Sequence, residues 1–302
     1  MKLGFLTAAL PDMNLEELLK WGSGQGFDMI EVATWPSSFE ERRYAGTQHI
    51  DIENLDEAEL KRVNDLLEKY KIEISSLAYY PNYLTPDKEA QEYAINHLKK
   101  VITAADILDV NMVGTFVGRD KNKGVQESLD EYEEVFTDIV KFAEDKKVKL
   151  AIENCPMLFE DRWPGGNNIA YSPQIWDEMF DRIPSDYLGL NLDPSHMIWQ
   201  QLDYVQAVYD FQDKIFHTHA KDTRMLDEKL GRVGIYGFDF YKDKVAGLGD
   251  IDWKAYLNAL YEVGYDGVVS VEHEDRDWED NQQEILDGIS LAKKLLDKYF
   301  VG

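Results

Sequence analysis

The sequence predicts an α/β fold, a (β/α)8 TIM barrel in which residues 1–302 form a single domain. Three observations lead to this fold class. Eight strand-like segments alternate with eight helical segments along the chain. Residues 7–12, which follow the first strand, read TAALPD and lack the glycine-rich turn of a doubly wound, dinucleotide-binding sheet. Polar residues gather where the last four strands end, and closed barrels build their sites at those ends.

Each expected strand is short, rich in apolar or β-branched residues and bounded by turn residues. The strands are expected at residues 2–7, 29–34, 73–80, 112–117, 149–155, 188–193, 215–221 and 267–272. Helices are expected at residues 14–25, 56–70, 87–108, 124–146, 172–181, 203–211, 252–263 and 281–299. Asn14 with Glu17, and Asp56 with Glu59, have the spacing of capping boxes.

Two long connections, residues 156–171 and 222–249, follow the fifth and seventh strands. Both are expected at the carboxyl-terminal face of the barrel, where catalytic loops of this fold lie.

Composition excludes several classes of partner. The formal net charge of −26 repels nucleic acid and anionic lipid. The chain has no apolar run of membrane-spanning length, and its first residues predict a strand instead of a signal peptide. Cys155 is the single cysteine, so an internal disulfide is excluded, and we interpret this residue as a packing residue. A reducing, cytoplasmic location is expected.

Four side chains near the ends of the last four strands share the inward phase of their strands. Alternate residues of a strand point to the same side, which directs Glu153, Asp193, His219 and Glu272 toward the barrel axis. Three converging carboxylates repel one another unless a cation lies between them. Three oxygen ligands and one imidazole suit one divalent ion, Mn2+, Mg2+ or Co2+, with Zn2+ also allowed.

These segments resemble the xylose isomerase-like TIM-barrel superfamily, and within it the sugar phosphate isomerase/epimerase branch. The resemblance rests on four segments: Ile152-Glu153-Asn154, Leu192-Asp193-Pro194-Ser195-His196, His217-Thr218-His219-Ala220-Lys221-Asp222 and Val269-Ser270-Val271-Glu272-His273-Glu274-Asp275. That superfamily includes ketose 3-epimerases, inosose dehydratase and isomerase, and endonuclease IV. The endonuclease branch needs further His and Asp ligands, which the fourth strand does not offer.

The resemblance implies roles for individual residues. It implies that the metal is held by Glu153, Asp193, His219 and Glu272, that Glu153 and Glu272 double as acid and base, and that His196 faces the substrate. Met225 stands where the ketose epimerases carry a substrate-binding arginine. From the sequence itself we add Lys221, Trp35, Trp163 and His49 as substrate-binding candidates, because they are expected at the same mouth.

The first functional hypothesis is a metal-dependent isomerase or epimerase that removes a proton beside a carbonyl of a sugar or cyclitol and passes through an enediolate. The second is a lyase or dehydratase acting on a keto-sugar, a 3-keto-glycoside or an inosose. A non-catalytic sugar-binding barrel is the third. The sequence leaves the sugar, the native metal and the oligomeric state open, a homo-oligomer included.

Overall fold

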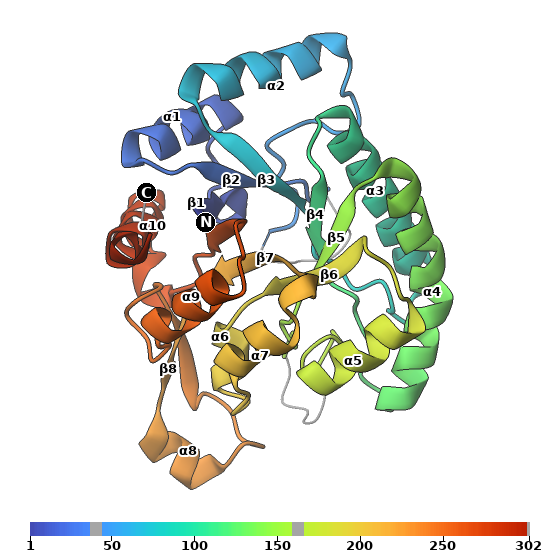
Figure 1. Ribbon diagram of the computed structural model, residues 1–302, viewed down its shortest axis with the longest axis vertical. Coiled ribbons are helices and arrows are strands. Elements are labelled where there is room, and N and C mark those ends of the chain that lie inside the picture. The colour runs from blue at the N-terminus through green and yellow to red at the C-terminus, as the bar shows by residue number, and fades with distance from the viewer. Residues whose placement is uncertain (37–43, 159–165, 301–302) are drawn as a thin grey trace.

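The computed structural model describes residues 1–36, 44–158 and 166–300. The predicted fold class is confirmed: eight parallel strands close into a barrel in the order β1-β10-β7-β6-β5-β4-β3-β2 (Figure 1). The barrel strands are β1 (Lys2–Leu6), β2 (Met29–Ala33), β3 (Glu73–Ala78), β4 (Met112–Thr115), β5 (Lys149–Glu153), β6 (Leu188–Leu192), β7 (Ile215–Ala220) and β10 (Val268–Val271). Several strands are shorter than the sequence predicts. Residues such as Tyr80 and Cys155 lie beyond the last hydrogen-bonded pair of their strands and line the mouth of the barrel.

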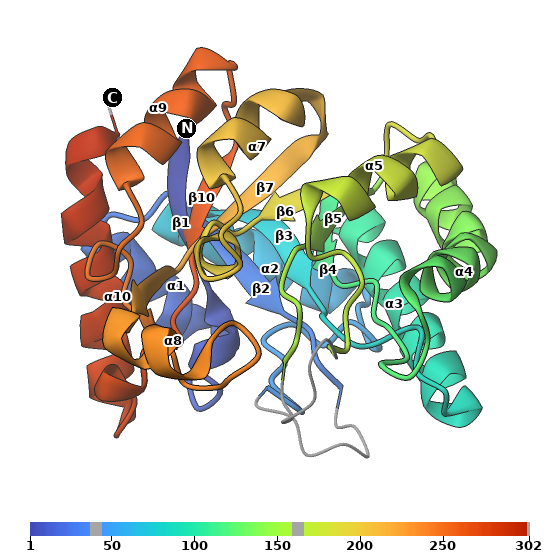
Figure 2. The ribbon, with the colours of Figure 1, turned by 90° about the horizontal axis from the view of Figure 1, so that it is seen from below.

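The helices surround the barrel and bury their apolar faces against it (Figures 1 and 2). They are α1 (Leu15–Gln25), α2 (Glu57–Tyr70), α3 (Lys88–Ile107), α4 (Val125–Lys146), α5 (Pro173–Arg182), α7 (Tyr204–Asp210), α9 (Trp253–Glu262) and α10 (Gln282–Leu296). Short 3-10 turns lie at Thr7–Ala9, Gln212–Lys214, Arg276–Trp278 and Asp297–Tyr299. The expected capping box of α1 is present, with Asn14 and Glu17 each accepting from the other's backbone N–H. At α2, the side chain of Asp56 accepts from the backbone N–H of Glu59.

Part of residues 222–249, which the sequence led us to treat as a loop, folds into regular structure. Strands β8 (Asp222–Met225) and β9 (Tyr241–Lys244) pair as an antiparallel hairpin around helix α8 (Asp227–Val233). Both strands are short and mostly polar, so they carry no alternation that a sequence pattern could reveal. In Figure 2, α8 and the loops that follow the strands lie at the end of the barrel away from the N- and C-terminal labels.

Asp222 fastens this insertion to the barrel. Its carboxylate accepts from the backbone N–H groups of Gly247 at 2.8 Å and Ile251 at 3.1 Å, and from the indole N–H of Trp253 at 2.8 Å. A Cβ at Gly249 would lie 2.1 Å from Asp222 Oδ1, so this close approach requires glycine. The last residue of the His-x-Lys-Asp segment therefore has a structural role.

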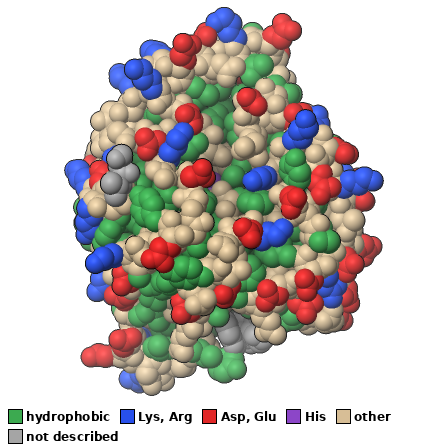
Figure 3. Space-filling model, viewed as in Figure 1, with side chains coloured by type: hydrophobic (Ala, Val, Ile, Leu, Met, Phe, Trp, Pro, Cys, Tyr) green, Lys and Arg blue, Asp and Glu red, His purple; other side chains and the backbone are tan. Residues whose placement is uncertain are grey.

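The strongly negative chain presents a mixed surface. Lysine and arginine side chains are interspersed with acidic ones over the face seen in Figure 3. Within the described ranges, no helix combines the length and the apolar character needed to cross a membrane. Figure 1 also shows the hairpin and α8 protruding beside the barrel.

Candidate metal centre and active site

The structure brings together the four side chains that the sequence predicts as metal ligands. Glu153 ends β5, Asp193 follows β6, His219 lies in β7 and Glu272 follows β10. One ligand atom from each lies within 4.8 Å of those of the other three. All four side chains are buried, with exposures of 0–7%. Inward phase at matched strand ends is therefore sufficient to make them converge.

Asp193 is held in place by backbone bonds that leave one of its oxygens unsatisfied. Its N–H donates to Asn154 Oδ1 at 2.7 Å, and its Oδ1 accepts from the N–H of Ser195 at 2.8 Å. Its Oδ2 is buried without a hydrogen-bond partner, 3.3 Å from Lys221 Nζ and 3.4 Å from His196 Nε2. This oxygen has an ion pair with Lys221 but accepts no hydrogen bond, so it remains available as a ligand.

The remaining donors face the same point. His219 Nδ1 lies 3.3 Å from Glu153 Oε1 and 3.4 Å from Glu272 Oε2. Carboxylate oxygens and one imidazole nitrogen form a donor set that a divalent cation accepts. The residues present therefore fit such an ion.

The buried charges at the site are stabilised by neighbouring charges of opposite sign. Burial opposes the charge of His219, yet the surrounding glutamates, Glu31 foremost, raise the pKa of its imidazole well above the ordinary value. Burial also opposes the charge of Glu272, but Lys221 and His219 hold the pKa of its carboxyl well below the usual range. For Asp193, burial outweighs the attraction of Lys221 and raises the pKa of the carboxyl. Asp193 is thus the ligand candidate with the least compensation.

Lys221 is the cation at the centre of this network. Its ammonium is 1% exposed and donates to Glu272 Oε2 at 2.6 Å and to Glu274 Oε2 at 2.9 Å. It also lies 3.0 Å from His196 Nε2. Burial opposes its charge, but the carboxylates, led by Glu272, raise the pKa of this ammonium well above its usual value.

A cavity of about 810 Å³ opens above the four residues and has the size of a small-molecule site. Of the four, Glu153 and Glu272 line it, whereas Asp193 and His219 lie behind them. The predicted substrate-binding residues Trp35, His196 and Lys221 line the cavity. Further lining residues include Tyr44, Tyr80, Asn82, Phe116, Arg119, Lys121, Trp199, Tyr241, Asp243, Glu274 and Arg276.

The other two substrate-binding candidates, Trp163 and His49, are not among the described residues that line the cavity. Trp163 lies outside the described residues. His49 is absent from the described residues that line the cavity; its Nε2 lies 3.2 Å from Leu10 O, and its Nδ1 lies 2.9 Å from Thr7 Oγ1. Since a carbonyl only accepts, Nε2 carries the proton and Nδ1 accepts from Thr7. Both ring nitrogens therefore already have protein partners.

Cys155 lies closer to the chemistry than the sequence indicates. It lines the cavity, and His196 lies close enough to influence its thiol. Burial raises the pKa of its thiol despite that neighbour, which disfavours the thiolate that nucleophilic attack requires. We retain the interpretation of Cys155 as a packing residue.

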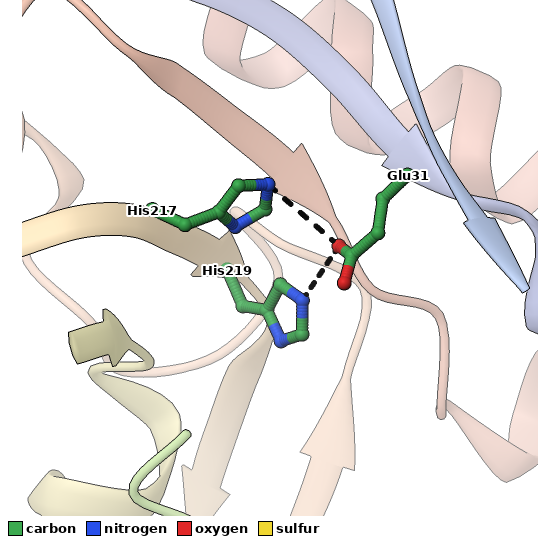
Figure 4. A group of neighbouring side chains, drawn as sticks. All are labelled: Glu31, His217 and His219. Carbon is green, nitrogen blue, oxygen red and sulfur yellow. Dashed lines mark hydrogen bonds and ion pairs between the residues drawn. The ribbon is translucent and has the colours of Figure 1, made fainter. Parts of the chain in front are cut away.

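One residue next to the site, Glu31, was missed by sequence reasoning. Glu31, in the middle of β2, is fully buried and belongs to a second group with His217 and His219 (Figure 4). Tyr80 donates its hydroxyl to Glu31 Oε1 at 2.6 Å. A glutamate inside an otherwise apolar strand is the available signal, because unpaired acidic residues are almost never fully buried.

Comparison with known proteins agrees with this architecture. Residues 19–295 match the model of the family described as xylose isomerase-like TIM barrel. The chain belongs to that family.

Similar proteins include an enzyme and two solved barrels. Inosose dehydratase of Lacticaseibacillus casei is 25% identical over 269 residues, which cover 84% of this chain and 87% of the relative. A crystal structure of an IOLI protein with a binding zinc atom superposes with a TM-score of 0.74 at 22% identity and covers 100% of both chains. A D-tagatose 3-epimerase-like protein gives a TM-score of 0.69 at 22% identity, covering 99% of this chain and 98% of the other. The two solved structures share the fold.

Proposed function

We propose that this protein is a divalent-metal-dependent isomerase or epimerase that moves a proton on a carbon next to a carbonyl of a sugar or cyclitol. The observation that carries the proposal is the convergence of Glu153, Asp193, His219 and Glu272 within 4.8 Å beneath a cavity. Two of these residues, Glu153 and Glu272, also line the cavity, so they are available to the substrate as well as to an ion.

One divalent ion per chain is the cofactor of this proposal, with Mn2+, Mg2+ or Co2+ preferred and Zn2+ allowed. When bound, it would polarise the substrate carbonyl and stabilise the negative charge that develops on oxygen. The orphaned Oδ2 of Asp193 supports its presence. The similar IOLI structure is named for a binding zinc atom, which supports a divalent ion as the cofactor of this proposal.

Glu153 and Glu272 are the proposed acid and base. They extend from β5 and β10, which are separated in the barrel order by β6 and β7. The two carboxylates therefore approach the cavity from different directions and address different faces of one substrate carbon. One removes the proton, giving an enediolate, and the other returns a proton to the opposite face. This division of roles produces epimerisation.

A second candidate function is a lyase or dehydratase on a keto-sugar, a 3-keto-glycoside or an inosose. The specific observation is the contact of 3.0 Å between Lys221 Nζ and His196 Nε2 at the cavity wall. This pair supplies a proton donor beyond the two glutamates, which a departing hydroxyl group needs. Similarity to an inosose dehydratase favours the same reaction class.

The test is incubation of the Mn2+-loaded protein with candidate ketoses and inososes in heavy water. Deuterium in recovered substrate or product reports proton abstraction, and product structure separates epimerisation from loss of water. Glu153→Gln with matched metal content is the control for exchange that the buffer or free metal causes. Tight substrate binding with no deuterium uptake would replace the proposal by the non-catalytic sugar-binding barrel.

A further inference from the structure

The two ring nitrogens of His219 face two different sets of groups. Nδ1 faces the proposed metal ligands, 3.3 Å from Glu153 Oε1 and 3.4 Å from Glu272 Oε2. Nε2 faces away from them and lies 2.9 Å from Glu31 Oε2. Figure 4 shows the carboxylate of Glu31 reaching across the barrel interior from β2 toward this ring.

Two hydroxyl groups, one after β3 and one in β10, hold Glu31 in this position. The hydroxyl of Tyr80 donates to Oε1 at 2.6 Å, and the hydroxyl of Ser270 donates to Oε2 at 3.0 Å. The side chain is fully buried, so water does not compete for its oxygens. A glutamate oxygen that already accepts from Ser270 still offers a lone pair to an N–H of His219.

Asn191 also approaches Nε2, with its Nδ2 at 3.0 Å. That nitrogen has a separate acceptor, the hydroxyl of Tyr80, at 2.9 Å. Asn191 Oδ1 lies 3.0 Å from His217 Nδ1 on the same side of the barrel interior. An ionised carboxylate has no proton to donate, so the contact of 2.9 Å between His219 Nε2 and Glu31 Oε2 requires the proton of the neutral ring to lie on Nε2.

We infer that Glu31 is a positioning residue for the metal centre: it holds a proton on His219 Nε2 and so directs the Nδ1 lone pair at the metal. A ligating imidazole must leave one nitrogen unprotonated, and a hydrogen bond at the other nitrogen selects that tautomer. This inference rests on the proposed function, because it gives Glu31 a role toward the ion that the four ligands would hold.

The alternative role for Glu31 is as a ligand of a second metal ion, together with His217 and His219. The ligand atoms of these three residues also lie within 4.8 Å of one another. Their contacts argue against it. Both ring nitrogens of His217 have protein partners, with Nε2 3.2 Å from Ser75 Oγ and Nδ1 3.0 Å from Asn191 Oδ1. Both oxygens of Glu31 accept hydrogen bonds. No polar atom of this group is among the unpartnered buried atoms of the described residues, whereas Asp193 Oδ2 is. The group is satisfied without an ion.

Glu31→Gln tests the inference. Glutamine keeps the size of the side chain, but its amide can donate to Nε2, which moves the ring proton to Nδ1 and removes the lone pair that faces the metal. Titration calorimetry with Mn2+ should give a dissociation constant about 10- to 100-fold higher than in wild type, the usual cost of losing such an outer partner. The stoichiometry should remain one ion per chain.

Ser270→Ala is the matched control, because it removes a partner of the same Glu31 oxygen and leaves the carboxylate in place. Its Mn2+ affinity should stay within about threefold of wild type, well below the change expected for loss of an outer-shell partner. The melting temperature of each variant in the presence of EDTA shows whether the substitution affects folding in the absence of metal. A merely structural role of Glu31 would lower the melting temperature of Glu31→Gln without changing its Mn2+ affinity.

A measurement on the wild type needs no variant. In the Zn2+-loaded protein, long-range 1H–15N correlation of the histidine rings should show His219 protonated at Nε2 and ligated through Nδ1. Protonation at Nδ1 overturns the inference, as does a Glu31→Gln affinity within threefold of wild type. Two ions in wild type with one in Glu31→Gln overturn it in favour of the second metal site. Absence of any bound ion in wild type overturns the proposed centre itself.

Discussion

The two sides of the barrel mouth treat a buried histidine in opposite ways. His219, in β7, lies among carboxylates that extend from β2, β5 and β10, and its pKa is raised well above the ordinary value. Beside the turn that follows β1, His49 meets only the hydroxyl of Thr7 and the carbonyl of Leu10, and burial lowers its pKa from 6.5 to about 4. Burial is common to both residues, so the neighbours decide the outcome.

This difference teaches how to interpret a histidine in this fold. A ring enclosed by neutral partners is a satisfied structural group. A ring enclosed by carboxylates, one of which has an orphaned oxygen, is a candidate ligand. The acidic side therefore carries the proposed chemistry, and the neutral side supports it. Each experiment below strengthens or removes one part of that contrast.

The largest effect is expected for the proposed acid and base on the acidic side. Glu153→Gln and Glu272→Gln each keep a coordinating oxygen but lose the proton carrier, so kcat should fall by about 10²–10⁴-fold. Metal content by atomic emission should remain measurable. In an epimerase the two variants differ, because each glutamate serves one face, and one variant still exchanges the substrate proton with solvent.

The control for these variants is saturation with Mn2+, which separates weak metal binding from loss of the base. Full turnover of both variants at saturating Mn2+ would remove the glutamates as proton carriers. The acid and base would then be sought in Lys221 and His196, which contact each other at the same cavity wall.

Metal retention should depend on the orphaned oxygen of Asp193. Asp193→Asn keeps an acceptor for the backbone N–H of Ser195 and replaces the negative charge by an amide. Loss of a ligand should weaken Mn2+ binding by more than the roughly 10- to 100-fold typical of an outer partner, and Asp193→Ala should abolish retention. Equilibrium dialysis measures this, and unchanged affinity of both variants would exclude the proposed ligand set.

The fold and the converging residues could be predicted because both depend on local patterns, the order of strands and helices and the inward phase near strand ends. Glu153, Asp193, His219 and Glu272 lie near matched strand ends, where an inward phase leaves few other arrangements. The position of His49 could not be predicted, since it lies in a connection whose path depends on tertiary contacts with Thr7 and Leu10.

Glu31 was missed for a different reason. Its partners, Tyr80, Ser270 and His219, come from three other parts of the chain, and no local motif marks the combination. The hairpin after β7 was missed because its strands are polar and short. Sequence periodicity thus predicts which side chains face inward, and it does not predict which of them hydrogen-bond across the barrel.

The neutral side predicts a pH-dependent stability. His49 has a folded pKa of about 4, below its ordinary 6.5, so the unfolded chain binds the proton more readily. Its contribution is fully present above pH 6.5 and is lost as the pH falls toward 4, by about 3 kcal/mol at most. In His49→Gln the unfolding free energy, from urea denaturation in EDTA, should fall less over this range than in wild type.

Thr7→Val is the control for this experiment. It removes the hydroxyl that donates to His49 Nδ1 but keeps the titrating ring, so its stability should be lower with the slope against pH retained. Equal slopes for wild type and His49→Gln would show that His49 is not a neutral buried group. The contrast between the two sides of the mouth would then be lost.

The smallest effect is expected at the aromatic wall that faces the glutamates. Trp35 is 6% exposed, lines the cavity and lies 5.7 Å from the ring of Tyr80. Trp35→Phe reduces the apolar surface offered to the C–H edges of a sugar, a loss of about 0.5–1.5 kcal/mol. KM should therefore rise roughly 2- to 10-fold while kcat stays unchanged, because such binding is the same in the ground state and the transition state.

Trp21→Phe on α1, where the indole packs on Phe5 away from the cavity, is the matched control and should leave KM unchanged. A fall in kcat for Trp35→Phe, with KM constant, would instead make Trp35 part of the catalytic side of the mouth.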